Sequence, residues 1–275
     1  MQKTHIIRKE PPRKKYLLYI DLLGFSDIVR KDWEKAEKVF SVIDSLNVHS
    51  HNAFHVVAFS DTILVYNHTD PNDAESHNYI VWYLIEFVED LHHRLVGQNL
   101  YFRAIILYGD FKRYKLKNVD CFYGTALIDA YERHKIIPSI GLFIDSACNH
   151  YNSYFRTAEF GNNLHFIYLT RSLESLYQDC SGIFPVEDLS IDDGYPYLVW
   201  EIKFLCEIHK KMRIHPDPNV RTKFLTVWDF YKRRYPHILS QLEKNSFNLK
   251  LISKNHDWGL QMTAMNNDMR YFKNI

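Results

Sequence analysis

Residues 16–27 have the sequence YLLYIDLLGFSD, and this stretch decides the fold. Residues 16–20 form a run of aromatic and aliphatic residues of strand length, and Asp21 closes it. Residues 24–26 (GFS) then open a segment that becomes helical, and apolar side chains recur at helical spacing over 33–48. We therefore expect a buried strand that ends at an aspartate and is followed by an amphipathic helix.

The next part of the chain predicts a compact alternation of strands and helices. The expected elements are strands at 54–59 and 62–66, a helix at 76–96, and a strand at 101–108 that contains Arg103. Only Ser60 and Asp61 separate the first two strands, which is typical of a tight hairpin with Asp61 at its tip. The resulting order β-α-β-β-α-β predicts an α+β fold of the ferredoxin-like or palm-like kind, with an antiparallel sheet that carries helices on one face.

The remaining sequence divides the chain into three parts. Further expected elements are a helix at 124–135, strands at 140–144 and 166–169, and helices at 198–212 and 219–234. Residues 1–15 are rich in Lys, Arg and Pro and are expected to be a flexible basic arm. We expect a catalytic domain at 16–175 and a mainly helical extension at 176–275 that packs on it.

Composition excludes several classes of protein. The chain has 275 residues, of which 46% are hydrophobic, and its formal net charge is +1. This balance disfavours a general nucleic-acid or membrane-surface binder, and no apolar run approaches the length needed to cross a bilayer. The nine glycines are too widely spaced for a GxGxxG motif or a P-loop. The four scattered cysteines, without a CxxC motif, favour free thiols and a cytoplasmic location.

Asp21 and Asp61 form the sharpest candidate site. Neighbouring central strands would bring their carboxylates together, and such oxygen ligands suit Mg²⁺ or Mn²⁺. Two ions of this kind activate a hydroxyl and neutralise a triphosphate. The turn through residues 22–24 would present backbone amides to phosphate oxygens. The simpler alternative is that each aspartate only caps a turn or a helix.

Four segments resemble the core of the class III nucleotide cyclases, in order and at fitting distances. They are YIDLLGFSD (19–27), VVAFSDTILVY (56–66), FRAIILYGDF (102–111) and FYGTALIDAYERHKIIP (122–138). The chain resembles most closely the pyrimidine cyclases of the bacterial Pycsar antiphage system, which make cyclic CMP or cyclic UMP. The resemblance covers residues 16–170, and 219–231 is similar to the C-terminal end of that subfamily.

The resemblance implies an activity and a set of partners. Asp21, Asp61 and the Leu22 carbonyl would bind two Mn²⁺ or Mg²⁺ ions, and the chain would convert CTP or UTP to the 3′,5′-cyclic nucleotide and pyrophosphate. The family works as a head-to-tail homodimer with active sites at the interface. The cyclic nucleotide would act on a separate effector in antiphage defence, without direct binding to nucleic acid or membrane.

The resemblance also assigns substrate-binding and catalytic residues. The substrate-binding set is Leu22, Leu23, Gly24, Phe25, Val57, Phe59, Ser60 and Cys121. Purine cyclases have a base-reading Lys and Asp at the positions of Val57 and Cys121, so adenine recognition of the usual kind is not expected. Alternation along the strand would place Val57, Phe59 and Asp61 on one face and give a smaller, aromatic base pocket, although Phe59 also suits a core position.

Two positions depart from the general family pattern. The helix after Gly124 would ordinarily carry a ribose-orienting Asn and a transition-state Arg, and these places hold Ile128 and Glu132. The pyrimidine branch keeps an Arg in the preceding strand, and we assign Arg103 to the triphosphate or the base, with an ion pair to a core carboxylate such as Glu132 as the alternative. An inactive cyclase-like module and a purine cyclase with unusual base contacts remain the competing functions.

Overall fold

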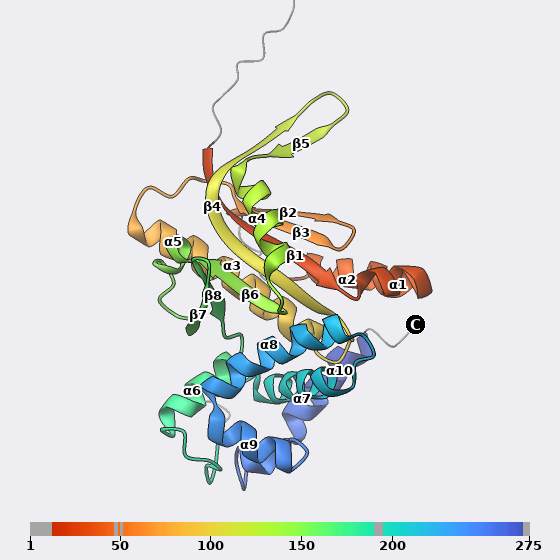
Figure 1. Ribbon diagram of the computed structural model, residues 1–275, viewed down its shortest axis with the longest axis vertical. Helices are drawn as coiled ribbons and strands as arrows, with labels where there is room; N and C mark the ends of the chain where they lie inside the picture. Colours follow the sequence, from red (N-terminus) through yellow and green to blue (C-terminus); the bar gives the residue numbers. More distant parts are fainter. Residues whose placement is uncertain (1–12, 47–48, 50–51, 190–194, 272–275) are drawn as a thin grey trace, which may run out of the picture.

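A computed structural model describes residues 13–46, 49, 52–189 and 195–271 of the chain (Figure 1). The strands are β1 (Arg13–Leu23), β2 (Phe54–Phe59), β3 (Thr62–Asn67), β4 (Tyr101–Lys115), β5 (Asp120–Tyr123), β6 (Gly141–Asp145), β7 (Thr157–Gly161) and β8 (Leu164–Ile167). The helices are α1 (Phe25–Lys31), α2 (Trp33–Asp44), α3 (Ala74–Leu95), α4 (Thr125–Ile136), α5 (Ser146–Asn149), α6 (Arg171–Asp179), α7 (Leu198–Ile214), α8 (Pro218–Arg234), α9 (Pro236–Lys244) and α10 (Gly259–Tyr271), with a short 3₁₀ turn, η3 (Leu249–Leu251).

The sheet is built around β1. This strand pairs antiparallel with β3 on one side and with β4 on the other, so both of its edges are satisfied. The full strand order is β2-β3-β1-β4-β6-β8-β7, and β5 pairs with the far end of β4. The expected α+β fold is confirmed, because the first four strands and the helices α1 to α3 follow the β-α-β-β-α-β order.

One part of the sheet is parallel rather than antiparallel. Strand β6 lies parallel to β4, and helix α4 forms the connection between them across the sheet. The sheet is antiparallel except at this pair, and helices cover both of its faces rather than the one face expected. The connection matters for function because it places α4 over the face of β1 and β4 that carries the candidate residues (Figure 1).

The two faces of β1 enter different cores. Leu18, Ile20 and Leu22 are buried in a cluster with the apolar faces of α2 and α3. Leu17 and Tyr19 belong to a second cluster, which includes residues of α4 and of the C-terminal helices. Side chains alternate between the faces of a strand, so the odd-numbered Asp21 and Leu23 lie on the face of the second cluster.

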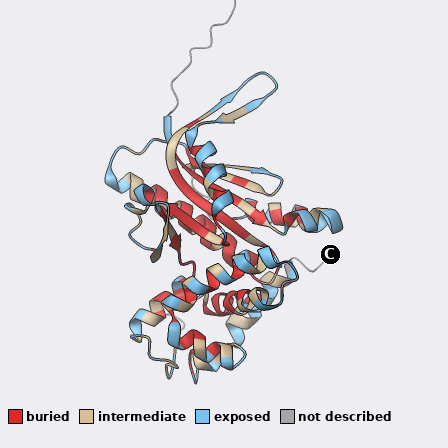
Figure 2. Ribbon diagram, in the orientation of Figure 1, coloured by how far each residue is buried: buried red, intermediate tan, exposed pale blue. Residues whose placement is uncertain are grey.

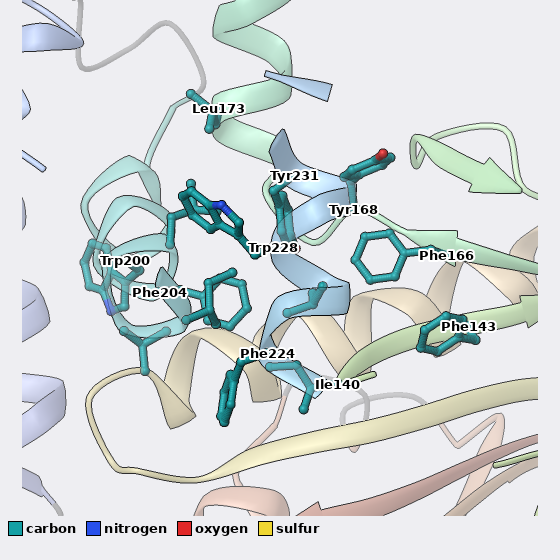
Figure 3. Close-up of a cluster of buried hydrophobic side chains, with 14 of the residues drawn as sticks. Ile140, Phe143, Phe166, Tyr168, Leu173, Trp200, Phe204, Phe224, Trp228 and Tyr231 are labelled. Carbon is teal, nitrogen blue, oxygen red and sulfur yellow. The ribbon is translucent and has the colours of Figure 1, made fainter. Parts of the chain in front are cut away.

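The C-terminal helices share this second core with the sheet. Figure 3 shows Trp228 and Tyr231 of α8 beside Phe204 of α7, with Phe166 of β8 on their other side. Phe166 stacks on Phe230 of α8, with the two ring centroids 4.4 Å apart. Helices α7 and α8 thus pack on the sheet, and buried residues run through both (Figure 2).

Element boundaries differ from the predictions at several points. Strand β1 runs to Leu23 instead of ending before Asp21, and it begins at Arg13, inside the expected basic arm, whose residues 1–12 lie outside the described ones. The ladder with β4, which pairs Arg13 with Phe111 and Leu23 with Tyr101, accounts for both extensions. No helix in the described part of the chain is long and apolar enough to span a membrane.

Candidate active site

The hairpin between β2 and β3 brings Asp61 beside Asp21. Asp21 faces Thr62 across the β1–β3 ladder, and the Leu22 N–H donates to the Asp61 carbonyl at 2.8 Å. Ser60 and Asp61 form the turn, and Ser60 has the left-handed φ of 55° that this tight connection requires. The expected position of Asp61 at the hairpin tip is confirmed, and the two aspartates lie on adjacent backbone segments.

The charges of Asp21 and Asp61 both act on the Tyr19 phenol. Burial raises the pKa of Tyr19, and the charges of Asp21 and Asp61 raise it further, whereas a hydrogen bond with Thr62 lowers it. Both charges act on one phenol because it lies two residues before Asp21 on the same face of β1. The charges of both aspartates therefore act on Tyr19, which lies on the Asp21 face of β1.

Arg103 forms an ion pair with one carboxylate oxygen of Asp21. Its Nη2 donates to Asp21 Oδ2 at 3.0 Å and its Nη1 donates to the Ile137 carbonyl at 3.0 Å. The two residues are register partners in β1 and β4, and Arg103 is 8% exposed. The Nε atom is buried without a hydrogen-bond partner among the described residues. The alternative partner Glu132 is wrong, because its side chain is exposed on α4.

His134 is a neighbour of Asp21 that the sequence did not reveal. Its Nε2 lies 3.9 Å from Asp21 Oδ2, and its Nδ1 lies 2.7 Å from the Tyr131 carbonyl. With Nδ1 as the donor of that hydrogen bond, Nε2 of the neutral ring carries a lone pair toward the site. Burial lowers the pKa of His134, so the neutral form is favoured. The helical pattern of α4 did not indicate a role for His134, because only the tertiary packing of α4 brings this residue to β1.

The donor set fits a hard divalent cation. The Asp61 carboxylate has no hydrogen bond or ion pair with any other described residue, and Asp21 Oδ1 has no side-chain partner in the same part of the chain. Two carboxylates that leave oxygen atoms free match Mg²⁺, which uses one or two carboxylates together with substrate phosphates. A site made of protein ligands alone is absent, because the described residues contain no cluster of three His, Cys, Asp or Glu.

The predicted phosphate turn has a mixed outcome. Gly24 has a φ of +93°, and a Cβ there would lie 3.1 Å from the Asn99 carbonyl. Leu22 and Phe25 are 2% exposed and belong to the core, so their side chains cannot contact substrate, and only their backbone atoms remain available. The Leu23 side chain is half-buried against the second core. Helix α1 has only seven residues.

The predicted base-reading residues lie in two separate places. Val57 is half-buried on β2, whereas Phe59 is 79% exposed near the hairpin tip, so its core alternative is wrong. Cys121 pairs with Tyr114 on the ribbon of β4 and β5, which extends beyond the sheet (Figure 1). The stretch of β4 from Arg103 to the start of that ribbon spans about 30 Å at the rise of an extended strand. One chain therefore does not bring Cys121 to Asp21.

Helix α4 presents no arginine to the site. Ile128 is 57% exposed and Glu132 is exposed, so both point away from the core. Arg133, the arginine of α4, donates to Asp145 at 2.6 Å and to the carbonyls of two residues in the β7–β8 turn. These contacts of the Arg133 guanidinium hold α4 against the end of β6. Among the described residues, a cation that contacts the phosphates must therefore come from an element other than α4.

Solved structures of nucleotide cyclases are similar to part of this chain. The guanylyl cyclase domain of the RhoGC fusion protein from the aquatic fungus Blastocladiella emersonii is 11% identical, with a TM-score of 0.43, over 57% of this chain and 96% of that one. The guanylate cyclase domain of RhGC from Catenaria anguillulae in complex with GTP is 10% identical, with a TM-score of 0.43, over 58% of this chain and 98% of that one. The adenylyl cyclase CyaB from P. aeruginosa is 9% identical, with a TM-score of 0.42, over 56% and 93%. No family model and no curated protein matches the chain.

Proposed function

We propose that this chain is a metal-dependent class III nucleotide cyclase that converts CTP or UTP to the 3′,5′-cyclic nucleotide and pyrophosphate. The observation that carries the proposal is the position of Asp21 and Asp61 on adjacent backbone segments, with a buried guanidinium bound to Asp21. The motif resemblance supports the same assignment. In the cell, the cyclic nucleotide would be a cytoplasmic second messenger that acts on a separate effector in antiphage defence.

The reaction needs positioning and charge, and it needs no protein nucleophile. The substrate 3′-oxygen forms a bond to the α-phosphorus, the bond to the leaving pyrophosphate breaks, and the 3′-hydroxyl proton passes to solvent or to a substrate oxygen. When bound, Mg²⁺ or Mn²⁺ would supply charge neutralisation and activation of the hydroxyl. Asp21 and Asp61 would hold that cation, and the buried Arg103 guanidinium would stabilise negative charge developing at the phosphate.

The separation of the site residues supports a homodimer. Cys121 and Asp21 lie at opposite ends of β4, so a single chain leaves the base-reading end and the catalytic end apart. A head-to-tail pair of chains would juxtapose the two ends and complete each site. The neutral side chains Val57 and Cys121, in place of the Lys and Asp of purine cyclases, support a pyrimidine base.

A product assay with four nucleotides tests this function. Purified protein is incubated with Mn²⁺ and ATP, GTP, CTP or UTP, and products are identified by mass spectrometry. We expect a cyclic product from CTP or UTP and a loss of at least about 100-fold in Asp61→Asn, because a cation ligand is removed. The matched control is Glu37→Gln, which neutralises an exposed carboxylate on α2 and should retain activity.

Each alternative function has its own outcome in the same assay. Cyclic AMP or cyclic GMP as the main product would identify a purine cyclase. The absence of any product, together with unchanged nucleotide binding in Asp61→Asn, would identify an inactive nucleotide-binding module. Either result contradicts the proposed pyrimidine cyclase.

A further inference from the structure

A cavity of about 600 Å³ opens next to the Asp21–Arg103 pair. Its floor includes Leu23 and Tyr101, which are register partners and lie two pairs beyond Asp21 and Arg103 along β1 and β4. Residues two positions apart share a face of a strand, so the cavity begins on the same side of the sheet as the two aspartates. Gly24 completes the edge of this floor.

The opposite wall comes from the C-terminal helices. Helix α8 is anchored there by Phe224, which is 3% exposed and packs edge-on against Tyr101 at 4.8 Å between ring centroids. The connection from α7 to α8 is held by Arg221, whose Nη1 donates to the His215 carbonyl at 2.8 Å. Packing and hydrogen bonding thus fix the position of Lys223, the residue before Phe224, on this wall.

The cavity has an excess of unpaired positive groups. Lys31 of α1, Lys211 of α7 and Lys223 of α8 line it, and none has a carboxylate within ion-pair distance among the described residues. Two of the aspartates that also line it serve as helix N-caps, since Asp32 accepts from the Lys35 N–H at 2.9 Å and Asp217 accepts from the Asn219 N–H at 2.8 Å. The third, Asp27, lies in the first turn of α1.

Lys223 belongs electrostatically to the candidate site. Burial lowers the pKa of Lys223, the Arg103 guanidinium lowers it further, and the charges of Asp21 and Asp217 raise it. The charges of Arg103 and Asp21 therefore act on the Lys223 ammonium, although its helix is far away in the sequence. With Lys35, which donates to the Gln98 carbonyl, four lysines surround this cavity, and they match a ligand that carries several negative charges.

We propose that this cavity binds the polyphosphate of the nucleotide, with Lys223 and Lys211 of the C-terminal helices as its cationic contacts. The identity of the ligand rests on the proposed cyclase function. The C-terminal extension then supplies, within one chain, cations for a site in which α4 has Glu132 at the place of the family's Arg. The proposal makes residues 198–234 part of the substrate site.

Binding of inorganic tripolyphosphate tests the cavity without relying on turnover. Isothermal titration calorimetry on the full chain compares wild type with Lys223→Met and Lys211→Met, which keep most of the aliphatic stem and remove the charge. We expect each change to weaken binding about tenfold or more, as for the loss of one charge-assisted phosphate contact. The matched control is Lys210→Met, an exposed lysine on α7 outside the cavity, which should bind as wild type does.

The outcomes separate the cavity from the cyclase activity. Wild-type protein that does not bind tripolyphosphate, or Lys223→Met protein that binds equally well, overturns the cavity assignment even if cyclic product is made. Binding that depends on Lys223 in a chain that forms no cyclic product retains the cavity and contradicts the proposed function. Lys223→Arg keeps the charge and should bind within a few-fold of wild type, which guards against a folding defect in Lys223→Met.

Saturating CTP or UTP connects the cavity to the substrate. The nucleotide should prevent tripolyphosphate from binding, because both place phosphates against the same lysines. Simultaneous, independent binding of nucleotide and tripolyphosphate would show that the cavity does not serve the substrate, and it would overturn the proposal.

Discussion

Asp21 and Asp61 carry equivalent carboxylates, but the two carboxylates have different surroundings. Asp21 neutralises Arg103, whose side chain is 10% exposed, and the Asp21 side chain is 18% exposed. Asp61 has no side-chain partner among the residues described. A carboxylate that holds a largely buried guanidinium contributes to stability, whereas a solvent-accessible one without a partner is available to a ligand.

The contrast predicts a difference in stability. Asp21→Asn should lower the free energy of unfolding by about 2 kcal/mol, because Arg103 loses its ionic acceptor in a partly screened pair. Asp61→Asn should change it by less than about 0.5 kcal/mol. Urea unfolding at neutral pH measures both values. Equal effects of the two substitutions would contradict the assigned roles, and activity should be lost in both.

Gly124 fixes the approach of α4 to the sheet. Its φ is +153°, and a Cβ there would lie 2.1 Å from the Asp110 carbonyl oxygen in β4. Gly124→Ala should therefore cost at least about 3 kcal/mol, since backbone must move. The control is Gly161→Ala, where φ is +102° and no atom lies within 4 Å, so only about 1 to 2 kcal/mol of backbone strain is expected.

Thermal and urea unfolding of the two glycine variants measure this difference. If Gly124→Ala is no less stable than Gly161→Ala, the close contact between α4 and β4 is wrong. Because His134 of α4 faces Asp21, a displaced α4 should also reduce cyclase activity in Gly124→Ala.

At the scale of elements, Glu201 joins α7 to α6. Its carboxylate is fully buried and accepts hydrogen bonds from the Ser172 N–H at 2.9 Å and the Leu173 N–H at 2.7 Å, which lie in the first turn of α6. Burial raises the pKa of Glu201 to about 8, although these two donors lower it. The folded chain therefore retains a proton that the unfolded chain releases near pH 4.5.

This linkage gives a pH dependence of known sign. The stabilisation from the protonated carboxyl is fully present below about pH 4.5 and is lost as the pH rises toward 8. Glu201→Gln removes the titrating group. Between pH 5 and 8, the unfolding free energy of the variant should therefore fall by about 1 to 3 kcal/mol less than that of wild type. Urea unfolding at several pH values measures the difference, and parallel curves for wild type and variant would contradict it. Glu37→Gln is the exposed control.

Sequence patterns predicted most of the longer elements. The helix expected at 76–96 is α3, the hairpin around Ser60 is present, and the helix after Gly124 is α4. The short strands β5 and β7 and the helices α6, α9 and α10 were missed. Helices α6 and α9 have nine residues each, which is shorter than the window over which helical periodicity is read, and short elements depend on tertiary contacts for their stability.

The candidate site was predictable only in part. The closeness of Asp21 and Asp61 follows from a hairpin beside a central strand, which local sequence can indicate. The ion pair with Arg103 depends on the exact register of β1 and β4, and the approach of His134 and Lys223 depends on how separate helices pack. Register and packing are properties of the whole fold, so no local pattern contains them.

At the scale of the whole molecule, one core joins the sheet to the C-terminal helices. The cluster that contains Tyr19 and Phe143 of the sheet also contains Trp200 of α7 and Trp228 of α8. Both tryptophans are buried, so their fluorescence reports on the helices. Removing the helices would expose a broad apolar surface on the sheet.

We expect the full chain to unfold in a single cooperative transition. In a variant with Trp33, Trp82 and Trp258 replaced by Phe, only Trp200 of α7 and Trp228 of α8 remain, and their fluorescence should change with the same urea midpoint as far-UV circular dichroism. Two separated midpoints would show that the helical extension is an independent unit. A helix pair that unfolded early would also take Lys223 away from the substrate site before the sheet is lost.

Strand β4 carries the guanidinium that faces Asp21 near one end and the ribbon with Cys121 at the other. An insertion of one residue between these ends would turn every following side chain to the opposite face of the sheet, whereas an insertion of two would preserve the faces. The spacing between the two ends can therefore change only in steps of about 6.6 Å. Natural length variants of this strand should differ by even numbers of residues, unless a bulge absorbs the odd one.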